Sequence, residues 1–224
     1  MKNLFNSYWR QFNKIDKKID NKYLFFFFFR RLLMLLRGIL RLRKFGIFIG
    51  RCVVLRCKSK LFIGTSVKFD DYCFIDAMST EGVRIGDNVN IGKYCRIEGS
   101  GSLYDLGTGI TLESGVGVNS NCFFGCAGGI RIGENTIIGE MVTFHSENHN
   151  YSDSEVHIKF QGVTREGIYV GQGCWIGAKS TILDGVIIGN GCVIAGGSLV
   201  KRGEYLDNAI YGGVPAKFIK MKHL

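Results

Sequence analysis

The feature that most constrains this chain is a six-residue repeat that begins near Ile63 and ends near Val200. An aliphatic side chain or Phe takes the first place of each unit. Gly often takes the second place, and a small or β-branched residue takes the fifth, as in IGDNVN, IGKYCR and IGNGCV. So short a period predicts strands of a few residues joined by corners, with three strands to a coil and coils stacked on one another. We therefore expect an all-β fold, a parallel β-helix whose core is built from the first places.

The composition agrees with a fold that has many tight corners. The chain holds 31 Gly and a single Pro, which argues against both disorder and collagen. We divide it into an N-terminal segment at 1–50, the β-helix at 51–202 with an inserted loop at 145–167, and a tail at 203–224.

The positive charge belongs to the N-terminus rather than to the repeat. Residues 1–60 hold 16 of the 29 Lys and Arg residues but only 2 of the 19 Asp and Glu residues, so the remainder is mildly acidic. A solenoid that binds nucleic acid would need a basic body, so we expect no nucleic-acid partner.

Within the N-terminal segment, Arg30, Arg37, Arg41 and Lys44 have the spacing of one stripe on an α-helix. This pattern is typical of a basic amphipathic helix at a membrane surface. The alternative is a helix packed on the body or on a neighbouring subunit. No stretch reaches the ~18 uncharged apolar residues that span a bilayer. We expect a cytoplasmic protein. Residues 1–45 would provide peripheral contact with the inner face of the cytoplasmic membrane.

Most of the eight cysteines follow the repeat and carry no metal or disulfide spacing. A small buried side chain suits the fifth place of the unit, and a reducing compartment fits the thiols. The fifth-place cysteines are Cys73, Cys95, Cys122, Cys174 and Cys192.

The repeat breaks at residues 144–151, Phe144 to Tyr151. Three of the four histidines, His145, His149 and His157, lie in or just after this break. A polar loop follows as far as Gly167. A rigid repeat builds a scaffold, so a break that gathers ionisable side chains is where we expect the chemistry.

The repeat resembles the hexapeptide-repeat acyltransferases, which fold as left-handed parallel β-helices. The similarity covers roughly residues 60–220 and is most specific in GCWIGAKSTILDGVIIG, IAGGSLVK and GGVPAKFIK. It is strongest with the sugar and polysaccharide O-acetyltransferase branch. The resemblance implies a homotrimer with active sites between neighbouring subunits, acetyl-CoA as the donor, and a sugar or surface-glycan precursor as the acceptor.

The same resemblance implies roles for particular residues. His149 takes the place of the catalytic base, which removes the proton of a sugar hydroxyl as it attacks the thioester. Asn119 and His145 take acceptor-side positions, and Glu147 or Asp153 could orient the imidazole. The donor positions are Ala178, Gly196, Lys201, Arg202, Lys217 and Lys220.

Two alternatives remain open at this stage. The first is a solenoid without catalysis that binds a partner. The second is a zinc lyase of the carbonic anhydrase type, which shares this fold. A catalytic zinc site needs three protein ligands, and no histidine precedes His145 in the chain, so we expect no metal requirement.

Overall fold

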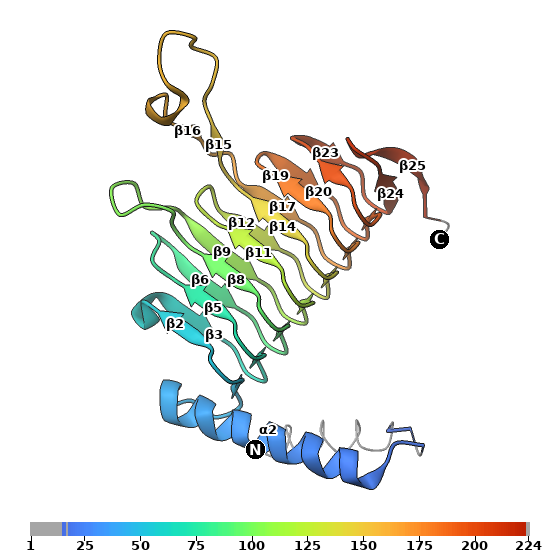
Figure 1. Ribbon diagram of the computed structural model, residues 1–224. Helices are drawn as coiled ribbons and strands as arrows, with labels where there is room; N and C mark the ends of the chain where they lie inside the picture. Colours follow the sequence, from blue (N-terminus) through green and yellow to red (C-terminus); the bar gives the residue numbers. More distant parts are fainter. Residues whose placement is uncertain (1–14, 17, 223–224) are drawn as a thin grey trace.

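The computed structural model describes residues 15–16 and 18–222, which form one long helix and a three-sided stack of short parallel strands (Figure 1). The stack is the predicted parallel β-helix, with each side formed by one sheet. Every parallel pair joins a strand to its counterpart in the next coil, such as β7 with β10 and β10 with β13. We call the three sides sheets A, B and C.

The strands follow one another from sheet A to B to C in each coil. Sheet A contains β1 (Phe48–Ile49), β4 (Lys68–Phe69), β7 (Asn90–Ile91), β10 (Gly117–Val118), β13 (Ile137–Ile138), β18 (Trp175–Ile176), β21 (Val193–Ile194), β24 (Ala209–Gly212) and the antiparallel β25 (Lys217–Met221). Sheet B contains β2 (Val54–Arg56), β5 (Phe74–Asp76), β8 (Arg96–Glu98), β11 (Phe123–Gly125), β14 (Thr143–His145), β19 (Thr181–Leu183) and β22 (Leu199–Val200). Sheet C contains β3 (Leu61–Ile63), β6 (Gly82–Ile85), β9 (Gly109–Leu112), β12 (Ile130–Ile132), β17 (Ile168–Val170), β20 (Val186–Ile188) and β23 (Gly203–Tyr205). The parallel coils thus start at β1 and continue to β24, slightly beyond the limits of 51 and 202 expected from the sequence.

The core confirms the assignment of the repeat positions. First-place residues such as Ile91, Ile138 and Ile176 are fully buried, and so are the fifth-place cysteines to within 2%. All eight cysteines are free thiols. The fifth place therefore favours small side chains, because the three-sided core of the β-helix is narrow near its corners.

Second-place glycines are needed because neighbouring coils approach closely. A Cβ built on Gly86 would lie 2.6 Å from the backbone nitrogen of Ser114 in the next coil. The left-handed backbone falls instead at fourth places, where Asn88, Asn121 and Asn135 have φ between 55° and 61°. Asparagine tolerates this conformation better than most residues.

The helix α2 (Asn21–Leu42) lies across the end of the stack where the first coil begins (Figure 1). Met34 and Gly38 are buried in the contact, and Gly38 permits a close approach, since a Cβ there would collide with the carbonyl oxygen of Ile47. Among the described residues, no helix is long and apolar enough to cross a membrane.

The basic stripe of α2 faces the β-helix, which corrects the expectation that it faces a membrane. Arg30 pairs with Asp70 and Asp71, at 2.5 and 3.0 Å. Arg37 and Arg41 donate to the carbonyl oxygens of Ile49 and Val53, at 3.4 and 2.7 Å, and Lys44 donates to that of Ile63. No preceding coil donates hydrogen bonds to the outward carbonyl groups of the first coil. These cations donate to those carbonyl groups instead.

Candidate active site

Two long insertions leave the β-helix at the same edge, the corner between sheets B and C. The segment 99–108 joins β8 to β9, and the segment 146–167 joins β14 to β17. Only the coil of β11 separates β8 from β14 in sheet B. The two insertions therefore project from levels two coils apart on one side of the molecule, as Figure 1 shows.

The second insertion carries His149 on a short hairpin. Strand β15 (Asn148–His149) pairs antiparallel with β16 (Val163–Thr164), and His149 lies opposite Val163. The Asn150 amide nitrogen donates to the carbonyl oxygen of Gly162 at 3.1 Å, which continues the pairing. The imidazole of His149 is exposed, so the hairpin presents it to solvent on an ordered backbone.

Both ends of this insertion are anchored by buried polar side chains. At its start, the Ser146 hydroxyl donates to the carbonyl oxygen of Gly125 at 2.8 Å and accepts from the Gly128 amide at 2.9 Å. At its end, the carboxylate of Asp184, which is 2% exposed, accepts from the amides of Glu166 and Gly167, at 3.0 and 2.8 Å. These contacts fix where the hairpin leaves the corner and where it returns.

A hollow of about 230 Å³ lies between the two insertions, and we call it the histidine hollow. His145 and His149 line it together with Glu98, Phe123 and Glu147. The ring of His145 lies 5.5 Å from that of Phe123, and burial lowers the pKa of His145 below its ordinary value. His145 is therefore largely neutral near pH 7 and can accept or donate one hydrogen bond with each ring nitrogen according to its tautomer.

Arg165 joins the two insertions beside the histidine hollow. Its guanidinium lies 2.9 Å from Oδ2 of Asp105 in the first insertion and 3.1 Å from Oε2 of Glu147 in the second. Glu147, one of the two carboxylates expected to orient His149, thus pairs with Arg165 instead. The other, Asp153, accepts from the amide of Glu155 at 2.9 Å.

A second hollow, of about 500 Å³, lies on the other side of the hairpin, and we call it the basic hollow. It is bounded by residues 148–152 and, across the corner, by Asp184, Lys201 and Arg202. Arg202 pairs with Glu166 at 3.0 Å, while Lys201 is exposed. His149 lines both hollows. Its side chain therefore borders the acidic and aromatic residues of the histidine hollow and the cations of the basic hollow.

The other predicted site residues lie elsewhere in a single chain. Asn119, Ala178 and Gly196 form a column at the corner between sheets A and B, following β10, β18 and β21. Within that column the Gly197 amide donates to the carbonyl oxygen of Ala178 at 2.8 Å. Lys217 and Lys220 are exposed on β25, beyond the last coil. One chain thus joins His149 with His145, Lys201 and Arg202 but not with Asn119.

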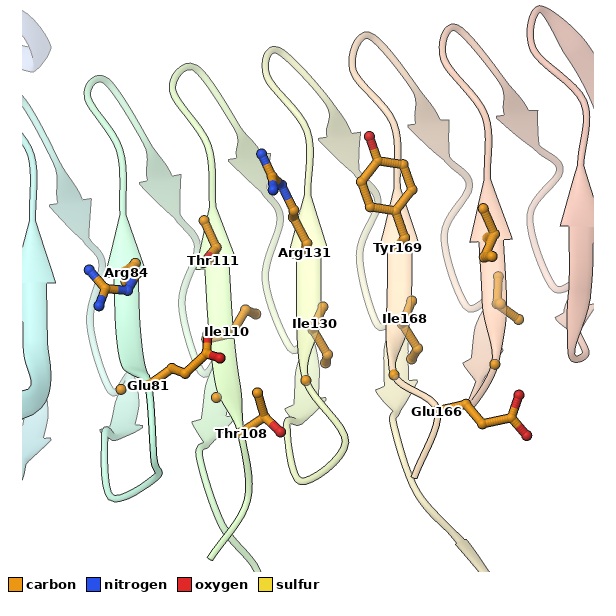
Figure 2. Close-up of a pocket in the computed structure, with 17 residues that line it drawn as sticks. Glu81, Arg84, Thr108, Ile110, Thr111, Ile130, Arg131, Glu166, Ile168 and Tyr169 are labelled. Atoms are coloured by element: carbon orange, nitrogen blue, oxygen red, sulfur yellow. The ribbon is translucent and has the colours of Figure 1, made fainter. Parts of the chain in front are cut away.

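A third space, a groove of about 420 Å³, runs across the outside of sheet C (Figure 2). Arg84, Thr111, Arg131 and Tyr169 stand along successive strands, with Glu81 and Glu166 toward the corner. No histidine or cysteine lines this groove. Its volume exceeds the 230 Å³ of the histidine hollow, but its lining offers no imidazole that could act as a base.

Nucleophilic cysteine and metal chemistry receive no support from the described residues. Cys126 borders the histidine hollow, but burial strongly raises the pKa of its thiol, and the thiol donates to the carbonyl oxygen of Phe124 at 3.3 Å. A thiol that stays protonated is a poor nucleophile. Over residues 15–16 and 18–222, no group of three or more His, Cys, Asp or Glu side chains could hold a metal ion.

Sequence reasoning missed Arg165, Asp105 and Asp184 as elements of the site. A signal for the shared corner was present, because both insertions follow units in the sheet B phase of the repeat, IEGSGS and FHSENH. Counting that phase places both insertions on one edge. The contacts of Arg165 have no such signal, because they depend on how two loops fold over each other.

Comparison with known families gives matches on the repeat itself. The bacterial transferase hexapeptide model (six repeats) matches residues 167–202, and the model for the hexapeptide repeat of succinyl-transferase matches residues 71–98. No curated protein matches the chain.

The chain is similar to several solved structures. A point mutant of AntD, an N-acyltransferase from Bacillus cereus in complex with dTDP-4-amino-4,6-dideoxyglucose and coenzyme A, is 22% identical. The match covers 80% of this chain and 82% of that one, with a TM-score of 0.53. A hexapeptide-repeat acetyltransferase from Vibrio cholerae with acetyl coenzyme A is 20% identical over 87% and 84% of the chains, with a TM-score of 0.48. The prediction from the repeat is confirmed for the fold: the chain contains hexapeptide repeats that match transferase models at residues 71–98 and 167–202, and it has a left-handed parallel β-helix like that of AntD.

Proposed function

We propose that the protein is an acetyl-CoA-dependent acyltransferase that modifies a sugar or surface-glycan precursor, with His149 as the general base. The observation that carries the proposal is the position of His149 between two hollows of different character. Direct transfer between two bound substrates needs a base that reaches both, and an exposed side chain on an anchored hairpin provides one.

The reaction is a transfer of the acyl group in one step. An acceptor hydroxyl in the histidine hollow attacks the thioester carbonyl carbon while His149 takes its proton. The new C–O bond forms, the C–S bond breaks, and the proton passes from the imidazolium to the departing thiolate of coenzyme A. A histidine in this role typically contributes ~10²–10⁴-fold to the rate.

The basic hollow suits the donor. Coenzyme A carries several phosphate charges, for which Lys and Arg are the usual partners. Lys201 is exposed at the rim, and Arg202, which pairs with Glu166 at 3.0 Å, is held beside the hairpin. Of the other expected donor residues, Ala178 and Gly196 lie on another edge of the β-helix, and Lys217 and Lys220 lie on β25.

This separation supports a site shared between copies of the chain in a homotrimer. The column of Asn119, Ala178 and Gly196 at one edge and His149 at another would meet only if a neighbouring copy brought its first edge against the insertion. Co-expression of Asn119→Ala with His149→Ala chains tests this. Mixed oligomers should recover part of the activity that neither variant has alone, because some shared sites would contain both intact residues. No recovery would assign each site to one chain.

The acceptor class is tested by thiol release from acetyl-CoA with a panel of sugars, nucleotide sugars, amino sugars and lipid-linked glycans. AntD is named as an N-acyltransferase and was crystallised with an amino sugar nucleotide, so the panel includes an amine arm. We expect release that depends on a hydroxyl acceptor and falls at least ~10²-fold in His149→Ala.

The panel also separates the alternatives. An amine acceptor that outperforms every hydroxyl would change the reaction to N-acylation at the same site. Absence of release, together with no binding of coenzyme A, would favour a solenoid that binds a partner. Activity that is abolished by a chelator would favour a metal enzyme.

A further inference from the structure

The outward face of α2 is a continuous apolar stripe. Phe25, Phe29, Leu32, Leu36 and Leu40 follow one another at helical spacing, and each is between 45% and 81% exposed. The rings of Phe25 and Phe29 are stacked, with centroids 6.2 Å apart. Apolar side chains exposed along most of a helix of 22 residues are unusual on a surface that meets only water.

The charges of the helix are arranged around this stripe. The helix contains no acidic residue. Cations from its middle to its last turn face the β-helix, where Arg30 pairs with Asp70 and Asp71 and Arg37 and Arg41 bind carbonyl groups. Exposed cations stand at both ends, with Lys18 and Lys22 near the start and Arg43 just past the last turn. The acidic residues Asp16 and Asp20 precede the helix, and Asp20 caps it by accepting from the Tyr23 amide at 3.3 Å.

We propose that α2 lies flat in the surface of an anionic lipid bilayer, with its apolar stripe in the acyl-chain region. Aromatic and aliphatic side chains flanked by cations suit that boundary, where the cations meet lipid phosphates. A second copy of the chain fits less well, because antiparallel pairing of two such stripes would bring Arg43 of one helix toward Lys18 and Lys22 of the other, where only the flanking Asp16 and Asp20 offset the charge. Charge therefore favours an anionic lipid surface over a copy.

The proposal reverses which face of the helix meets the membrane. The basic stripe is occupied in capping the first coil, so binding depends chiefly on apolar burial and less on charge. The coils stack at ~4.8 Å, and four spacings separate β1 from β13 in sheet A. If the proposed function holds, the coil that carries His149 lies ~20 Å beyond the first coil, so a glycan carried on a lipid would have to extend at least that far from the bilayer to reach it.

Flotation of the full-length protein with vesicles tests the proposal. The probes are vesicles of phosphatidylcholine alone and of phosphatidylcholine with phosphatidylglycerol. The test variant replaces three exposed stripe residues, Phe29→Ser/Leu32→Ser/Leu36→Ser. The matched control, Leu206→Ser/Val214→Ser, removes residues that are 63% and 72% exposed at the far end of the β-helix. Circular dichroism checks that each variant folds, and Leu40→Asp provides a single-site variant at an 81% exposed position.

We expect wild type and control to float with the anionic vesicles. The triple variant should lose at least ~10-fold in binding, since burying even one such side chain is worth about that factor. Binding should persist in part at about 1 M NaCl, where the screening length is only ~3 Å. Equal flotation of the triple variant, or no flotation of wild type, would overturn the proposal. A fall in molar mass of the triple variant by light scattering, with unchanged flotation, would instead assign the stripe to a second copy.

Discussion

The Asp184 carboxylate offers the sharpest test of how the β-helix holds the insertion that carries His149. Asp184 is buried and accepts hydrogen bonds from the amides of Glu166 and Gly167, at 3.0 and 2.8 Å. Asp184→Ala removes the acceptor of both amides at the point where the insertion returns to sheet C. Hydrogen bonds to a charged group are worth about 1.5–3 kcal/mol each. Because Glu166 itself is exposed and its amide can reach water, we expect a total loss of about 2–4 kcal/mol rather than the full sum.

Urea unfolding followed by circular dichroism measures this loss, and limited proteolysis measures the opening of the insertion. A loss of that size is a large part of the stability of a typical domain, so the midpoint should fall clearly. Asp184→Asn should lose less, since its amide oxygen can still accept from both donors. Asp87→Ala is a matched control, because Asp87 also accepts two hydrogen bonds, from the amide and hydroxyl of Thr65, but at an exposed corner. Should Asp184→Ala lose under ~1 kcal/mol and resist protease like wild type, the proposed anchoring role would be refuted.

Three further predictions concern the site and the core. Arg165→Ala should lower kcat/KM for acyl transfer by about 10–10²-fold with little change in the urea midpoint, because the bridge to Asp105 and Glu147 positions the insertions; an unchanged rate would contradict this. His145→Gln should make the loss of stability below about pH 6.5 shallower in urea titrations. Burial lowers the folded pKa of His145, so the unfolded chain binds more protons as the pH falls through the unfolded and then the folded pKa; an identical pH profile would contradict this. Under native conditions a thiol reagent should label only Cys52 and Cys57, since the other six cysteines are buried; rapid labelling of a third thiol would show that the core opens.

Much of the β-helix follows from the order of residues in the repeat. The first-place Ile91 and Ile138 point inward, and the fifth-place Cys95 and Cys122 fill the narrow turns, as the sequence predicts. The reason is local: a unit of two or three extended residues and a corner fixes the direction of every side chain relative to its own backbone. The same regularity makes the break at 144–151 visible, which is why His149 could be selected without a structure.

The candidate site could be predicted only in part, because its contacts are not local in the sequence. The sequence similarity assigned roles to Asn119 and His149 but did not show that they lie on different edges of the prism. Arg165 could be recognised as important only after Asp105 and Glu147 were seen on either side of it. Contacts between two insertions depend on how the loops fold in space, which no period in the sequence encodes.

The N-terminal helix shows most clearly which properties follow from the sequence and which follow from the tertiary structure. The sequence by itself determined that residues in this segment form a helix with a basic stripe and an apolar stripe, because helical spacing depends only on the positions of the side chains in the chain. Only the tertiary structure decided which stripe turns inward. The first coil leaves the carbonyl groups of Ile49, Val53 and Ile63 without a preceding coil, and guanidinium and ammonium groups satisfy them. A backbone carbonyl group left without a hydrogen-bond partner costs more free energy than an exposed leucine does. The cationic side chains therefore contact the β-helix, and the apolar stripe stays exposed.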